Sequence, residues 1–246
     1  MPSGGSASGW DGPGILLDIE GTTSSIAFVY DVLFPYARRE LVPFLEARWD
    51  DPEVARARDL IARDAGAEDF QSWVAGASPD QARARLVAEL QRLMDADAKA
   101  TGLKALQGLI WREGYRAGQL RSHVYADVPP ALRAWSAAGR DVRVYSSGSA
   151  EAQRQLFGHT EAGDLRPFLR GYHDTKVGPK RAAQSYAAIA ADMGLRPAEI
   201  VFLSDVAEEL DAARAAGMQT LLVVRPGNAP AREGHDYRVI DDFAQV

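Results

Sequence analysis

Residues 12–28 of the chain read GPGILLDIEGTTSSIAF, a short apolar run that ends in two acids two positions apart. Residues 15–17 predict a buried strand. In an extended chain, residues i and i+2 face the same side, so Asp18 and Glu20 are expected to project together past the end of this strand. Gly21 allows a turn there, and Thr22 and Thr23 supply hydroxyl and N–H groups beside the acids.

Two carboxylates with nearby backbone donors suit the binding of a hard cation together with a phosphoryl group. An aspartate in this position can also be the nucleophile, because carboxylates attack phosphorus to give aspartyl-phosphates. An acidic turn that follows a strand and has no catalytic role is the alternative for this segment taken alone.

The composition is that of a globular protein, with 46% hydrophobic and 25% charged residues in a chain of 246 residues. A net charge of −6 makes nucleic acid and anionic membrane surfaces unexpected partners. The chain has no cysteine, which excludes disulfides and thiol chemistry. Residues 1–12 lack the pattern of a signal peptide, so we expect a disordered tail there and a cytoplasmic protein. No heptad stripe or apolar edge stands out, and a monomer is expected.

Residues 29–120 contain no convincing strand and carry apolar residues at helical spacing, such as Leu86, Leu90 and Leu93. Ser78, Pro79 and Asp80 are typical of a helix start. The sequence therefore predicts an all-helical cap domain, inserted directly after the first strand and acting as a lid.

From residue 121 onward the pattern alternates between helices and short apolar strands. Strands are expected at 142–145, 200–203 and 220–224, and each follows a helix that ends at a glycine, the residue that best tolerates a left-handed C-terminal cap: Gly139, Gly194 and Gly217. Such alternation predicts a doubly wound, Rossmann-type α/β fold with a parallel sheet. The expected core domain comprises residues 13–28 and 121–246.

Ligands of such sheets bind beyond the carboxyl ends of the strands, and polar clusters follow the expected strands. Ser146 and Ser147 could donate hydrogen bonds to phosphate, and Lys180, expected at a helix start, could neutralise phosphate or an acid. Asp205 would join Asp18 as a ligand of Mg²⁺. Alternatively, the serines form a simple turn, Asp205 caps the next helix, and Lys176 and Lys180 are solvated surface.

Two further acids complete the expected site. Glu20 is the candidate general acid and base. Glu209 and Thr22 are expected to support the metal from outside its direct ligands. Residues 225–228, which follow the last of these strands, are expected to form a turn with a possible role at the edge of the site.

The order of acid pair, serine, lysine and acid pair resembles the haloacid dehalogenase (HAD) superfamily of hydrolases, and the helical insertion resembles its caps. Glu20 departs from that superfamily, which has aspartate at this position. Longer strings are similar to the enolase-phosphatase E1 (acireductone synthase) family: DIEGTT at 18–23, QGLIWR at 107–112, YSSGS at 145–149 and VRPGN at 224–228.

The resemblance implies an Mg²⁺-dependent enzyme of methionine salvage, with one ion per chain. It implies conversion of 2,3-diketo-5-methylthiopentyl 1-phosphate to acireductone and phosphate, through an aspartyl-phosphate. By this resemblance Asp18, Glu20 and Asp205 bind the metal, Ser146 and Ser147 the substrate, and Lys180 the phosphate. A phosphatase of another small sugar or keto phosphate, and a non-catalytic phosphate- or metal-binding module, are the alternatives.

Overall fold

The structure, a computed structural model, describes residues 10–230 and 234–246. The chain divides into a core unit, made of residues up to Val29 and from Arg121 onward, and a helical unit, Tyr30–Leu120. Residues 1–9 of the expected tail lie outside the described residues, and Trp10 donates its indole N–H to the carbonyl of Gly14 at 3.2 Å. Within the described ranges, no helix has both the length and the apolar character needed to cross a membrane.

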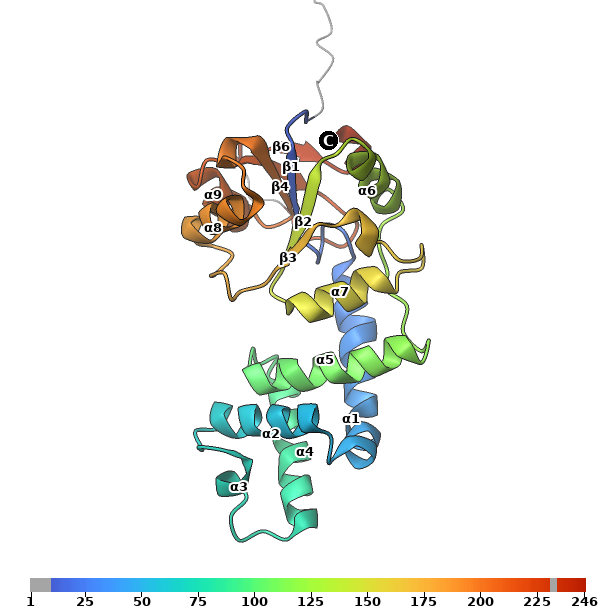
Figure 1. The fold of residues 1–246 in the computed structure, drawn as a ribbon, viewed down its shortest axis with the longest axis vertical. Coiled ribbons are helices and arrows are strands. Elements are labelled where there is room, and N and C mark those ends of the chain that lie inside the picture. The colour runs from blue at the N-terminus through green and yellow to red at the C-terminus, as the bar shows by residue number, and fades with distance from the viewer. Residues whose placement is uncertain (1–9, 231–233) are drawn as a thin grey trace, which may run out of the picture. The chain divides into compact units, whose positions relative to one another are not determined.

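The core unit is built on a six-stranded parallel sheet with the order β3-β2-β1-β4-β5-β6, which confirms the predicted doubly wound fold (Figure 1). The strands are β1 (Gly14–Leu17), β2 (Asp141–Tyr145), β3 (Gly171–His173), β4 (Ile200–Ser204), β5 (Gln219–Val223) and β6 (Arg238–Ile240). Leu16 of β1 pairs with Arg143 on one side and Phe202 on the other. The chain order reverses at β1, and ligands of doubly wound sheets bind at such a switch point.

Helices cover both faces of this sheet. Helices α6 (Val128–Ala137) and α7 (Ala150–Gly158) lie on one face, and α8 (Ala183–Met193) and α9 (Ala207–Ala215) lie on the other (Figure 1). Apolar side chains of α8, α9 and the sheet form a buried core, and burial of each large one stabilises the fold by about 1.5–3 kcal/mol. The predicted stop glycines after α6, α8 and α9 all have positive φ: Gly139 (77°), Gly194 (67°) and Gly217 (92°).

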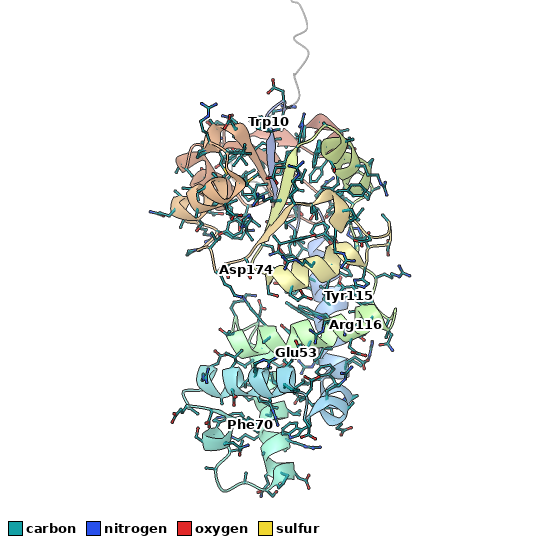
Figure 2. The ribbon with its side chains drawn as sticks, viewed as in Figure 1. Trp10, Glu53, Phe70, Tyr115, Arg116 and Asp174 are labelled. Atoms are coloured by element: carbon teal, nitrogen blue, oxygen red, sulfur yellow. The ribbon has the colours of Figure 1, made fainter. Side chains whose placement is uncertain are left out.

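The helical unit consists of helices joined by turns and loops, and none of its residues lies in a strand, as its sequence pattern predicts. A π-helix (Phe28–Leu33) leads into α1 (Phe34–Arg48), followed by α2 (Pro52–Asp64), α3 (Phe70–Trp73), α4 (Pro79–Asp95) and α5 (Thr101–Arg116). Ser78 caps α4 by accepting a hydrogen bond from the N–H of Gln81, and Leu86, Leu90 and Leu93 are buried as expected. Glu53 of α2 is labelled in Figure 2, and its two carboxylate oxygens accept hydrogen bonds from Nη1 and Nη2 of Arg112 in α5.

Three features differ from the predictions. Strands β3 and β6 were not predicted, because three-residue edge strands carry too little apolar pattern to be recognised. Helix α8 begins at Ala183 rather than Pro179, so Lys180 lies in the turn before the helix. Short 3-10 helices also occur at Arg166–Phe168, Pro197–Glu199 and Phe243–Gln245.

Candidate active site

Asp18 follows the central strand β1 and is almost fully buried. Its backbone N–H donates to the carbonyl of Leu203 at 3.0 Å, and its carboxylate accepts the N–H of Ile19 at 2.7 Å. The Nζ atom of Lys180 lies 2.7 Å from Asp18 Oδ1 and 2.6 Å from Glu209 Oε2. The sheet therefore positions the candidate nucleophile, Asp18. The loop before α8 supplies the cation beside it, Lys180, and helix α9 supplies Glu209, the second carboxylate that contacts Lys180.

The turn before α8 is held by three side chains that bond its carbonyl groups. These hydrogen bonds run from Tyr145 Oη to Gly178 (2.9 Å), from Ser185 Oγ to Pro179 (2.8 Å) and from Tyr186 Oη to Lys180 (2.7 Å). Burial lowers the pKa of Lys180, but the carboxylates of Asp18 and Glu209 outweigh that effect, so its pKa is raised above the ordinary value. Lys180 is a fixed cation.

Glu209 was expected to support the metal, and the structure places it against Lys180 and Ser204, whose Oγ donates to Glu209 Oε2 at 3.2 Å. Burial and the Asp18 carboxylate raise the pKa of Glu209 to about 7. Its observed contact is thus with the lysine, which it helps to orient.

Glu20 lies beside Ser146 in the turn after β1. Ser146 Oγ donates to Glu20 Oε2 at 3.3 Å and accepts the N–H of Gly148 at 3.2 Å. Burial, with the nearby Asp18 carboxylate as a second cause, raises the pKa of Glu20. A carboxyl group in hydrogen-bond contact with other polar groups of the site can serve as a general acid and base, the role predicted for Glu20. Ser146 is buried in this contact, whereas Ser147 is exposed.

Asp205 directly follows β4, and its carboxylate is close to the turn after β1. A Cβ atom on Gly21 would come within 2.3 Å of Asp205 Oδ2, and Gly21 has φ of +74°, so this position requires glycine. Asp205 does not cap α9, whose N-cap residue is Val206. Burial and the Asp18 carboxylate raise the pKa of Asp205 to about 7.

The carboxylates of this site show whether it could bind a cation. In residues 10–230 and 234–246, no three His, Asp or Glu side chains form a group that could hold a metal ion. Asp205 Oδ1 is nonetheless buried without a hydrogen-bond partner, and the Asp18 carboxylate is near enough to raise its pKa. Mg²⁺ is commonly held by one or two carboxylates, with water and substrate phosphate as the other ligands. The pair Asp18 and Asp205 fits that requirement, and the metal role of Glu20 stays a prediction.

The two lysines of the loop at 174–180 differ in their surroundings. Lys176 is exposed, as a solvated surface lysine would be, whereas the side chain of Lys180 is only 11% exposed. Asp174, labelled in Figure 2, shapes the start of this loop, because its carboxylate accepts the N–H groups of Ala150 (3.1 Å) and Lys176 (2.9 Å).

Sequence reasoning left the role of residues 225–228 open, and it missed Asp127. Arg225 is buried, pairs with Asp127 at 2.8 Å, and donates to the carbonyl of Thr22 at 3.1 Å. Asn228 donates to the carbonyl of Gly21 at 2.9 Å. Residues 224–228 (VRPGN) follow the carboxyl end of a strand, and this position could have indicated that Arg225 and Asn228 lie near the site. Asp127 lies just before a helix, and its sequence position gave no such indication.

Comparisons with known proteins agree with this arrangement. The family model described as haloacid dehalogenase-like hydrolase matches residues 13–217. Proteins named "Enolase-phosphatase E1" from Synechococcus elongatus and Pseudomonas aeruginosa are 48% identical over 235 residues and 52% identical over 232 residues. Each alignment covers 94% of this chain and 96% of the relative.

Among solved structures, the UTR4 protein of Saccharomyces cerevisiae is similar to this chain with a TM-score of 0.79 and 34% identity. That alignment covers 96% of this chain and 100% of the yeast protein. A dehalogenase that is 18% identical to this chain has a TM-score of 0.53, and this similarity indicates a shared fold only. The chain belongs to the enolase-phosphatase E1 family of the haloacid dehalogenase-like hydrolases.

Proposed function

We propose that this chain is an Mg²⁺-dependent enolase-phosphatase of methionine salvage. It would convert 2,3-diketo-5-methylthiopentyl 1-phosphate to acireductone and phosphate. The observation that carries the proposal is the contact of 2.7 Å between Lys180 Nζ and Asp18 Oδ1, a fixed cation beside a buried carboxylate at the switch point of the sheet. The name shared by relatives 48% and 52% identical supports the choice of substrate.

In the phosphatase half of the reaction, a carboxylate oxygen of Asp18 attacks phosphorus, and the bond from phosphorus to the substrate oxygen breaks. Glu20 donates a proton to that leaving oxygen. Glu20 then takes a proton from water, whose oxygen attacks the aspartyl-phosphate, so that phosphate leaves and Asp18 is restored. Lys180 neutralises charge on the phosphoryl group, and Ser146 and Ser147 donate hydrogen bonds to it.

In the enolase half, a base removes a proton from a carbon beside a carbonyl. We assign this role to Glu20, whose side chain is one methylene longer than the aspartate of the wider superfamily. Glu20→Asp should therefore impair enol formation more than phosphate release. Following the two steps separately tests this assignment, which fails if both steps lose equally or neither step changes.

Asp18 and Asp205 would hold one Mg²⁺ per chain, with Glu20 as the third predicted ligand and with Thr22 and Glu209 supporting the site from outside. The bound ion would supply positive charge to phosphate oxygens and to the enolate oxygen. We also propose that the helical residues 29–120 act as a lid, and that the protein is a cytoplasmic monomer. Sedimentation tests whether the protein is a monomer, and cell fractionation tests whether it is cytoplasmic.

The deciding experiment measures phosphate release and ultraviolet absorbance of the enol product together, with and without Mg²⁺. The wild type should form both products, and only with Mg²⁺. Asp18→Asn should slow phosphate release by roughly 10³-fold or more, because it removes the nucleophile. Asp164→Asn, which changes an exposed carboxylate paired with Arg166, is the control and should be as active as the wild type. Phosphate release from other phosphate esters without any enol product would contradict the proposal and favour a different phosphatase.

A further inference from the structure

The turn after β1 is held from outside through consecutive backbone carbonyl groups. The donors come from two distant segments of the core unit: Asn228 Nδ2 to Gly21 (2.9 Å), Arg225 Nε to Thr22 (3.1 Å) and the backbone N–H of Tyr125 to Thr23 (3.1 Å). This turn also carries Glu20. A displacement of its backbone would therefore displace the Glu20 carboxyl group.

The amide groups of the same turn are also engaged. The N–H groups of Thr22, Thr23 and Ser24 all point to the carbonyl of Ile19, at 3.2, 2.9 and 2.9 Å. With its amides bonded within the turn and its carbonyls bonded to Asn228 and Arg225, the turn has little freedom to change its backbone conformation.

Arg225 is itself held on every side. Its Nη1 and Nη2 atoms donate to the two carboxylate oxygens of Asp127 at 3.0 and 2.8 Å, and Nη1 also donates to the carbonyl of Asp241 at 2.8 Å. Its guanidinium carbon lies 4.5 Å from the ring centre of Tyr125 and 4.8 Å from that of Phe243. Lysine cannot reproduce this planar set of bonds.

Buried ion pairs are weak evidence for a contribution to stability, because desolvation offsets much of the attraction. The Arg225–Asp127 pair therefore calls for another explanation, and its contact with the turn supplies one. The sheet holds the backbone of Asp18 directly, through the bond from its N–H to the Leu203 carbonyl at 3.0 Å, whereas the turn contacts Asp18 only through the Thr23 hydroxyl, which donates to the Asp18 carbonyl at 3.1 Å. The support acts on the part of the turn that bears Glu20.

We propose that Arg225 and Asn228 are positioning residues that hold the Glu20 carboxyl group at the leaving oxygen of the substrate. The inference rests on the proposed role of Glu20 as general acid. Neither residue needs to touch the substrate, since both act through the backbone of residues 21 and 22.

This role predicts a dependence on the leaving group. An alkyl oxygen leaves slowly unless it is protonated, whereas p-nitrophenolate leaves as a stable anion. Loss of Glu20 positioning should therefore slow phosphoryl transfer from alkyl phosphates to Asp18 and spare the same transfer from p-nitrophenyl phosphate. Loss of stability alone would lower both activities by the same factor.

The experiment compares kcat/KM for the diketone phosphate and for p-nitrophenyl phosphate in Asn228→Ala and Arg225→Lys. This ratio reports the steps up to departure of the leaving group, so it leaves out hydrolysis of the aspartyl-phosphate, in which Glu20 acts as the base for every substrate. Both variants should lose about 10-fold or more on the diketone phosphate, a part of the 10²–10⁴-fold that general acid–base catalysis supplies. Both should stay within about 2-fold of the wild type on p-nitrophenyl phosphate, because Asp18 and Lys180 keep their positions. Asn228→Ala removes one side-chain amide, so it keeps the test available if Arg225→Lys does not fold.

The matched control is Arg143→Lys, which alters another largely buried arginine, paired with Asp141 at 3.0 Å and distant in sequence from the turn. It should keep the wild-type kcat/KM on both substrates. Equal losses on both substrates in Asn228→Ala, an unchanged activity in that variant, or the same selective loss in Arg143→Lys would each overturn the inference. If the wild type hydrolyses p-nitrophenyl phosphate but not the diketone phosphate, the proposed substrate is wrong, and glycerol phosphate then serves as the alkyl ester.

Discussion

Carboxylates gather around a single ammonium group at the carboxyl end of β1. Burial and the proximity of Asp18 raise the pKa of Asp205 and of Glu209 to about 7. Lys180 contacts Asp18 and Glu209, while Asp205 Oδ1 is left without a partner. Individual side chains thus create an excess of negative charge at one point, which is the property that favours a bound cation.

Gly21 offers a direct test of how closely Asp205 approaches the turn. Gly21→Ala places a Cβ atom 2.3 Å from Asp205 Oδ2 at a φ of +74°, so we expect loss of activity and a large loss of stability. Gly194→Ala is the matched control, because its φ of +67° is similar but nothing lies within 4 Å of the added Cβ. The control should lose about 1–2 kcal/mol in urea unfolding and keep its activity. Similar behaviour of the two variants would contradict the crowding described for Gly21.

His173 predicts a pH dependence of stability. Burial and the nearby Arg143 lower the pKa of His173, and its Nε2 atom is buried without a hydrogen bond. Below a pH of about 6.5 the unfolded chain binds a proton at this histidine that the folded protein resists, so the free energy of unfolding should fall as the pH falls. The effect should end once the pH is below the folded-state pKa.

The measurement compares the urea unfolding of the wild type and His173→Gln between pH 7.5 and pH 5. As the pH falls, the unfolding free energy of the wild type should decrease relative to that of the variant. The other titrating groups are common to both proteins, so their effects cancel in this comparison. A difference that does not vary with pH would show that His173 does not contribute.

At the scale of elements, the loop between β3 and α8 positions the cation of the site. The helix begins three residues beyond Lys180, because Ala182 is the extended N-cap residue of α8. The Lys180 carbonyl is thereby free to accept the Tyr186 hydroxyl. A buried tyrosine on the helix thus fixes the backbone of the lysine that precedes it.

Tyr186→Phe should weaken this connection. Removing the hydroxyl leaves the Lys180 carbonyl without its donor, so we expect a loss of about 1 kcal/mol in urea unfolding and a rise in KM for the phosphate ester. Tyr36→Phe, which removes a hydroxyl bonded to Gln119 at 2.7 Å in the helical unit, is the control. It should lose similar stability with an unchanged KM. An unchanged KM in Tyr186→Phe would argue against a role of this contact in phosphate binding.

For the whole molecule, two compact units share one chain, and the cluster formed by Lys180, Asp18 and Glu209 lies in the core unit. A ligand that binds this cluster in the folded state alone must stabilise the core unit against unfolding. Stability therefore provides a readout of cation binding that does not depend on turnover.

Adding Mg²⁺ to chelator-treated protein should raise the unfolding free energy by about 2.7 kcal/mol at a concentration 100 times its Kd. Asp205→Asn should abolish most of this gain, because it removes one of the two carboxylates proposed to hold the ion. Asp164→Asn should respond as the wild type does. A gain of equal size in Asp205→Asn would exclude Asp205 as a ligand.

Much of the fold could be predicted from local patterns. Apolar runs at 15–17 and 200–203, helical spacing across 29–120 and glycines at 139, 194 and 217 act over a few residues, so they are visible in one dimension. Edge strands β3 and β6 were missed because hydrogen bonds to their neighbours, rather than their own residues, define them.

The site divides in the same way. The types and order of Asp18, Glu20, Ser146, Lys180 and Asp205 along strand ends were visible in the chain itself, because a parallel sheet brings those ends to one edge. The partners of these residues were not visible. That Glu209 orients Lys180 and that Arg225, Asn228 and Asp127 hold the turn after β1 depends on contacts between segments up to 207 residues apart. Such contacts arise only when the packed core fixes where each backbone passes.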